Sequence, residues 1–210
     1  MGWSVIARAL THRSPFIRVL FAIAIGSVFF AGAWTMAYAV LPEGATRFSL
    51  GFAPALDARA NAGAVAATVF LWNSLLGFGV IVIASAYSVG PISLGYLAPW
   101  TWLIRFGLAL GTNSFVLVVP GARAMPLDPA VLLTHAGVRE MVAYFIVAAV
   151  LAKATLWRQR RLTDRRLVRV RHLRDLRFTL PEVALLASGF FILAWSAVVE
   201  AGQIAALQKL

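Results

Sequence analysis

Strongly polar side chains within otherwise apolar stretches are the first candidates for chemistry in this chain. Asn73 lies in one such stretch and Asn113 in another, each beside serine and glycine residues. A buried amide needs a hydrogen-bond partner, so both side chains are expected to face protein. Gly107 and Gly111 form a G-x-x-x-G pattern, which lets two helix backbones approach closely. These features favour helix packing over the second reading, in which Asn73 and Asn113 line a substrate path.

A second candidate set is the segment T-H-A-G-V-R-E at residues 134–140. His135 and Glu140 are five residues apart, so on a helix their side chains point in different directions. A metal site needs more ligands, and the other histidines, His12 and His172, are assigned to the opposite side of a membrane. No metal site is therefore predicted.

Glu200 is an isolated acid near the end of the last apolar stretch. Proton or cation coupling requires another ionisable group at the same depth, and the sequence shows none, so we interpret Glu200 as a carboxylate facing water. The chain has no cysteine and no H-E-x-x-H, G-x-S-x-G, P-loop or G-x-G-x-x-G motif. These absences remove the usual signatures of hydrolases, nucleotide sites and thiolate sites. We predict neither enzymatic activity nor a cofactor.

The elements that must position these residues are apolar helices. Hydrophobic residues make up 61% of the 210 residues and charged residues 13%, with a mean hydropathy of +0.83. Soluble domains are less apolar and more charged, so we predict an all-α integral membrane protein forming a single transmembrane domain. A helix needs about 20 apolar residues to cross the bilayer. The predicted spans are 19–41, 63–87, 101–119, 138–157 and 183–205.

Residues 88–100 join the second and third predicted spans, and Gly90 and Pro91 interrupt their apolar character. We interpret this segment as a connector, with a re-entrant piece and an extra span as open alternatives. An extra crossing would place the two basic segments of the chain on opposite sides of the membrane. That conflict favours five spans.

The net charge of +11 is concentrated outside the predicted spans. The positive-inside rule places the N-terminus and the basic segment 158–180 in the bacterial cytoplasm and the C-terminus outside. Apolar residues recur every third position from Leu167 to Leu176, which predicts an amphipathic helix on the anionic inner leaflet. Nucleic acid is the alternative partner, and we set it aside because topology and lipid contact already account for the arginines. The predicted lipid-facing residues are Arg158, Arg160, Arg161, Arg165, Arg166, Arg169, Arg171, Arg174 and Arg177.

Three stretches carry a resemblance to a known family: L-W-N-S-L-L-G-F-G-V at 71–80, S-V-G-P-I-S-L-G at 88–95, and L-T-H-A-G-V-R-E-M-V-A-Y-F-I-V-A-A at 133–149. They resemble the stage II sporulation protein M family of small polytopic membrane proteins. In this resemblance His135, Gly137 and Glu140 match the family's Pro-His-Gly-x-x-Glu-Leu motif. Thr134 stands where proline is usual, and Ala136 is inserted between histidine and glycine.

The resemblance implies a membrane scaffold or interaction subunit of a multi-protein complex. In spore formers, the resembled protein joins peptidoglycan-degrading partners. The expected partners are other membrane or extracytoplasmic subunits, docked by the segment from His135 to Glu140. A transporter or channel subunit, including a homo-oligomer, and an accessory subunit of a pigment or respiratory complex are the alternatives. The motif residues singled out for a partner or structural role are Asn73, Gly90, Pro91, Asn113, His135, Gly137 and Glu140.

Overall fold

The structure of this chain is a computed structural model, which describes residues 2–46, 61–114, 136–164 and 166–207. Most of the described residues are helical, as predicted. Within these described ranges, three helices are long and apolar enough to cross a membrane. They are Pro15–Val40 (α2), Ala62–Ser85 (α3 Ala62–Trp72, the π-helix η2 Asn73–Phe78 and α4 Gly79–Ser85), and Leu180–Ala205 within α8 (Leu180–Leu207).

The long helices expose apolar side chains that a soluble protein would bury. Val28 on α2, Leu75 on η2 and Phe191 on α8 are each at least 70% exposed. The 26 residues of α2 span about 39 Å at 1.5 Å per residue, which exceeds the roughly 30 Å hydrocarbon core of a bilayer. Lipid is therefore the environment that these outward faces suit.

Two shorter helices complete the bundle, and one of them forms its centre. These are α5 (Leu97–Gly111) and α7 (Ala136–Leu151), extended by the 3-10 turns η3 (Leu94–Tyr96) and η4 (Ala152–Ala154). Eight consecutive α7 residues, 143–150, are buried, and α7 packs against α2, α5 and α8. Helix α5 begins four residues before the predicted third span, and residues 115–119 of that prediction lie outside the described residues.

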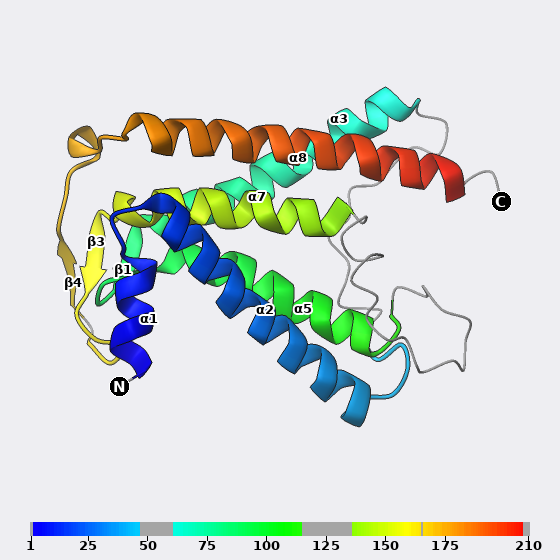
Figure 1. Cartoon of the computed structure of the whole chain (residues 1–210), viewed down its shortest axis with the longest axis horizontal. Helices are drawn as coiled ribbons and strands as arrows, with labels where there is room; N and C mark the ends of the chain where they lie inside the picture. Colours follow the sequence, from blue (N-terminus) through cyan, green and yellow to red (C-terminus); the bar gives the residue numbers. More distant parts are fainter. Residues whose placement is uncertain (1, 47–60, 115–135, 165, 208–210) are drawn as a thin grey trace.

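A small sheet lies at one end of the bundle, together with α1 (Gly2–Leu10), and we call this the sheet end (Figure 1). Its strands are β1 (Tyr87–Val89), β2 (Ile92–Ser93), β3 (Trp157–Gln159) and β4 (Leu167–Arg169), in the order β2-β1-β3-β4. Strands β1 and β2 form a hairpin whose turn contains Gly90 with φ of +56°, a conformation that glycine adopts at little cost. Residues 88–96 are thus a connector and contain no membrane-spanning helix.

The amphipathic helix predicted from the apolar spacing of Leu167 to Leu176, within the basic segment 158–180, is wrong. Residues 157–169 supply two strands, and the short 3-10 turn η5 (Leu173–Asp175) follows. The reason is a pairing partner remote in sequence: β3 runs parallel to β1, and the backbone nitrogens of Leu156 and Trp157 donate to the carbonyl of Ala86. These backbone hydrogen bonds replace those that a helix would form. A helix here would also bring many like charges together on adjacent turns, which is unfavourable.

Helix α1 was not predicted and lies across the sheet end (Figure 1). Its last residue, Leu10, is buried in the main core, and the Tyr96 hydroxyl donates to the Leu10 carbonyl at 3.0 Å. A helix placed across the end of a membrane-spanning bundle has the orientation of an interfacial element.

Candidate functional site

Three polar side chains from three helical elements meet inside the bundle. Asn73 begins η2, Glu140 lies in α7 and Glu200 lies in α8. The Asn73 Nδ2 donates to Glu140 Oε1 at 2.7 Å, and the Glu200 carboxyl group lies close enough to that of Glu140 for the two to interact electrostatically. We call Glu140 and Glu200 the acid pair. All three side chains are half-buried, and they come from parts of the chain that are far apart in the sequence.

A glycine brings Asn73 close to Glu140. Gly77 lies one turn after Asn73, and a Cβ atom placed on it would stand 2.4 Å from the ring of Tyr144, which lies one turn after Glu140. Only glycine therefore lets η2 approach α7 this closely. The wider turn of the π-helix over residues 73–78 also changes which side chains of this segment face α7.

A second contact holds α8 against α7. The Ser196 hydroxyl donates to the Ala136 carbonyl at 2.7 Å. Ser196 lies one turn before Glu200 in α8, and Ala136 lies one turn before Glu140 in α7. Ala197 and Ala201 pack with Val65 and Val69 of α3. The acid pair therefore lies where α3, α7 and α8 meet.

The acid pair has an unusual charge environment. Two neighbouring carboxylates repel each other and have no donor between them, so their approach favours a bound proton or cation. None of the ion pairs between described residues involves Glu140 or Glu200. The pair can bind and release a proton, or exchange it for a small cation held by carboxylate and amide oxygens.

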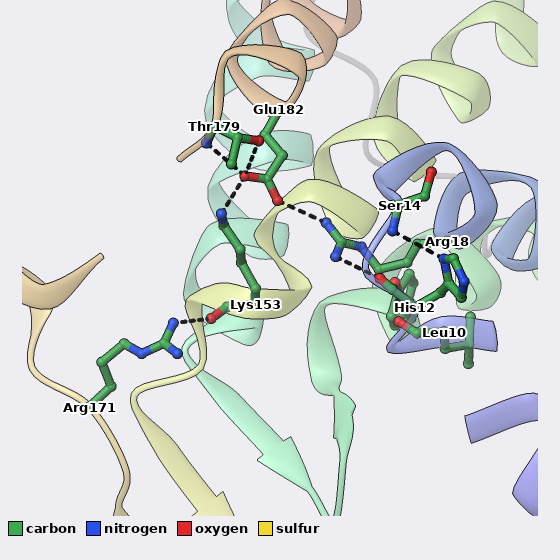
Figure 2. Close-up of polar contacts among 9 residues, drawn as sticks. Leu10, His12, Ser14, Arg18, Lys153, Arg171, Thr179 and Glu182 are labelled. Carbon is green, nitrogen blue, oxygen red and sulfur yellow. Dashed lines mark hydrogen bonds and ion pairs between the residues drawn. The ribbon is translucent and has the colours of Figure 1, made fainter. Parts of the chain in front are cut away.

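A different carboxylate lies at the sheet end, surrounded by cations (Figure 2). Glu182 Oε1 lies 3.2 Å from Arg18 Nη2, and Oε2 contacts Lys153 Nζ. Oε2 also accepts from the backbone nitrogen and hydroxyl of Thr179, at 2.8 and 2.9 Å. We call Glu182 and these three partners the Glu182 cluster. It joins the start of α2, the end of α7 and the start of α8.

The Glu182 cluster was missed by the sequence analysis. Glu182 is 3% exposed and Arg18 5%, so both charges are buried. A local signal was present, because Thr179 and Glu182 form a T-x-x-E capping box before an apolar run. The two basic partners come from distant parts of the chain, and no local pattern points to them.

The structure separates the residues that were predicted to carry function. Asn73 and Glu140 are together, whereas Asn113 lies past the end of α5 with φ of +50° and donates to Glu43 Oε1 at 2.8 Å. Gly90 and Pro91 lie in the turn at the sheet end. His135 lies outside the described residues, so its position relative to Glu140 is untested. A Cβ on Gly137 would meet nothing within 4 Å.

Two further predictions can be compared with the structure. Gly107 and Gly111 do mediate a close approach, because a Cβ on either would stand 2.6 Å from a backbone carbonyl of α2. The interpretation of Glu200 as an isolated carboxylate facing water is wrong, since its side chain is half-buried and interacts with that of Glu140. The sequence gives Glu140 no visible partner because the two glutamates are 60 positions apart.

The predicted lipid-facing arginines lie in the β3–β4 region, except Arg165, which is outside the described residues. The Arg169 guanidinium lies 5.5 Å from the centre of the Trp157 ring, and Arg171 Nη1 donates to the Lys153 carbonyl at 2.7 Å. The remaining described arginines of the predicted set are exposed.

Two of the three stretches on which the predicted resemblance rested meet through Asn73 and Glu140, and the third lies at the sheet end. Among the described residues, no group of three or more histidine, aspartate or glutamate side chains could hold a metal ion. No family model, curated protein or solved structure matched the chain, so its function has to be inferred from these contacts.

Proposed function

We propose that this chain is a bacterial inner-membrane protein that crosses the bilayer five times, with its N-terminus in the cytoplasm and its C-terminus outside. Besides the three long helices, α5 and α7 run between the same two ends of the bundle (Figure 1). The 18 residues of η3 and α5 together suffice for a crossing. The eight described arginines of residues 158–177 lie at the sheet end, and the positive-inside rule favours a cytoplasmic location for that end.

Within the membrane, we propose that the chain is a subunit of a transporter or channel that binds a proton or small monovalent cation at the acid pair. The contact between Glu140 and Glu200 carries this proposal. Carboxyl groups at membrane depth cost several kcal/mol to bury as ions, and those in membrane proteins commonly mark ion or proton pathways. Among the described residues the acid pair forms no ion pair with a basic side chain, so a proton or cation can balance its charge.

Each of the three residues has a role in this proposal. Glu140 and Glu200 together hold the exchanging proton or cation. Asn73 donates to Glu140 and fixes the orientation of its carboxyl group. Since Gly77 and Tyr144 hold η2 against α7, a change in that packing would change access to the pair.

The scaffold function implied by the family resemblance ranks second. It needed Glu140 to be available to an extracytoplasmic partner, whereas the Glu140 carboxyl group is engaged by Asn73 and Glu200 inside the bundle. The sequence also offered few buried ionisable groups, which weighed against a transporter. The acid pair removes that objection.

The test is ion flux in liposomes that contain the purified full-length protein and a pH-sensitive dye. Under imposed proton, sodium or potassium gradients, we expect uptake of at least one ion, lost in Glu140→Gln and in Glu200→Gln. Glu43→Gln is the matched control, because Glu43 bonds to Asn113 away from the pair. It should retain the flux of the unmodified protein.

Absence of flux for all three ions in the unmodified protein would overturn the transport proposal. Mass spectrometry of proteins that co-purify in mild detergent then tests the scaffold function. A defined set of partners that binds the unmodified chain and Glu140→Gln equally would support a scaffold that does not use the acid pair.

A further inference from the structure

The sheet end has an outward face on which aromatic and basic side chains lie side by side. Tyr87 pairs with Trp157, and Trp157 pairs with Arg169, across neighbouring strands. Directly paired residues project from the same face of a sheet, so these three form one row. Tyr87 and Arg169 are exposed, and the Arg169 guanidinium lies over the Trp157 ring. Tyrosine and tryptophan are enriched at the depth of lipid headgroups.

Exposed apolar side chains lie between the arginines of this region, which we call the arginine hairpin (residues 156–177). Leu162 is 82% exposed and Leu173 is 69% exposed. Leu167, Val168 and Val170 are also exposed, on or next to β4. Large apolar side chains between arginines are unfavourable on a surface that contacts only water. An interface between water and hydrocarbon accommodates both.

Most of the positive charge of the arginine hairpin is uncompensated. Nine arginines stand against two aspartates in residues 158–177. The one ion pair found here among described residues joins Arg174 to Asp175, at 3.9 Å. Arg158, Arg160, Arg161 and Arg166 are exposed and have no ion pair within the described part of the chain. Their guanidinium groups are free to bind phosphate, with which they form bidentate hydrogen bonds.

The arginine hairpin borders the ends of two membrane-inserted helices. It begins two residues after η4, which extends α7, and it ends three residues before Leu180, the first residue of α8. Arg171 donates to the Lys153 carbonyl, which fastens the hairpin to the end of α7. Its arginines and exposed leucines are therefore held close to the depth where α7 and α8 leave the hydrocarbon.

We propose that the arginine hairpin binds anionic phospholipid headgroups of the leaflet in which α7 and α8 end. The guanidinium groups of Arg158, Arg160, Arg161 and Arg166 bind lipid phosphates, while Tyr87, Trp157 and the exposed leucines enter the interface. Nucleic acid would account for the charge but not for the exposed leucines and valines, nor for the continuity with helices that enter the membrane. This inference does not depend on ion transport by the acid pair.

The test compares the full-length protein in nanodiscs of phosphatidylcholine with the protein in nanodiscs that contain phosphatidylcholine and phosphatidylglycerol in equal parts. Amide hydrogen exchange of residues 156–177 is the readout, with the far end of α2 as an internal reference. We expect exchange in the hairpin to slow by at least about tenfold with phosphatidylglycerol, since each arginine contributes to binding an anionic surface. High salt should reverse part of the protection.

Two matched variants give the proposal its controls. Replacing Arg158, Arg160, Arg161 and Arg166 together by glutamine should abolish the difference between the two lipid mixtures, whereas replacing the same four by lysine should retain most of it. If glutamine and unmodified hairpins respond equally to phosphatidylglycerol, the proposal is wrong. It is also overturned if lipid composition has no effect and an added oligonucleotide protects the hairpin, because the surface would then bind nucleic acid.

Discussion

The Glu182 cluster and the acid pair surround their carboxyl groups in opposite ways, with Glu182 buried and Glu140 and Glu200 half-buried. Glu182 contacts two basic side chains and accepts two hydrogen bonds from Thr179. Glu140 instead contacts an amide and a second carboxyl group. In the first arrangement basic side chains of the chain balance the carboxylate charge, whereas the second needs a proton or a cation.

The difference indicates which of the two buried charges is structural. The Glu182 cluster ties three helices together at the sheet end, where the Glu182 carboxylate is paired with Arg18 and Lys153 (Figure 2). The acid pair also lies where helices meet, but it can gain or lose a bound proton or cation. We therefore expect substitutions in the Glu182 cluster to affect stability, and those in the acid pair to affect function more than stability.

The largest effect is expected for Glu182→Ala. It leaves the buried Arg18 guanidinium without its carboxylate, and breaking a buried ion pair costs about 3–5 kcal/mol. Thermal unfolding in detergent should show a large fall in Tm. Asp175→Asn is the control, because Asp175 pairs with Arg174 at an exposed site and should unfold at an unchanged temperature. Equal Tm values for both variants would mean that the Glu182 cluster does not stabilise the bundle.

The next effect concerns the packing that brings Asn73 to Glu140. In Gly77→Ala the new Cβ collides with the Tyr144 ring, and overpacking of this kind costs about 1–3 kcal/mol. Gly79→Ala, two residues later in the same helix, meets nothing within 4 Å and should be neutral or stabilising by about 0.5–1 kcal/mol. Tm measurements of both variants, with ion flux, check whether this close approach also controls the acid pair.

The sequence predicted the long helices well because hydropathy is a local property that the bilayer selects directly. The predicted spans 19–41, 63–87 and 183–205 each lie within a few residues of a long helix in the structure. The amphipathic helix was predicted wrongly. Apolar residues at every third position do not reveal that β3 pairs with β1, which lies some 70 positions earlier in the chain.

The candidate site was predicted only in part, for the same reason. Asn73 and Glu140 are recognisable as polar residues in apolar helices. Their contact depends on the close packing of Gly77 against Tyr144, which a single sequence does not predict. Glu200 was predicted to be alone because its partner belongs to another helix. Polar residues in a membrane helix can thus be identified locally, whereas their partners are set by the packing of the bundle.

A smaller effect distinguishes the proton-sharing arrangement from a simple hydrogen bond. Glu140→Gln retains an acceptor for Asn73 and supplies a donor for Glu200, so we expect a loss of stability below about 1 kcal/mol. Glu140→Ala leaves the Asn73 amide without its partner and should cost about 1–3 kcal/mol. Infrared spectroscopy of the unmodified protein should show a protonated carboxyl band that is missing in Glu140→Gln. If the band persists unchanged in that variant, Glu140 and Glu200 do not share the proton.

The smallest effect is the coupling between Asn73 and Glu140, measured by a double-mutant cycle with Asn73→Ala and Glu140→Gln. Hydrogen bonds between helices within membranes average about 0.6 kcal/mol, because polar groups also find partners in the unfolded state. The Arg18 and Glu182 charges should couple more strongly in a parallel cycle with Arg18→Gln and Glu182→Gln, since both are ionised and buried. Coupling energies in the opposite order would show that the acid pair, rather than the Glu182 cluster, is the structural element. A weak coupling at Asn73 with loss of ion flux would instead mean that this amide contributes to ion binding far more than to stability.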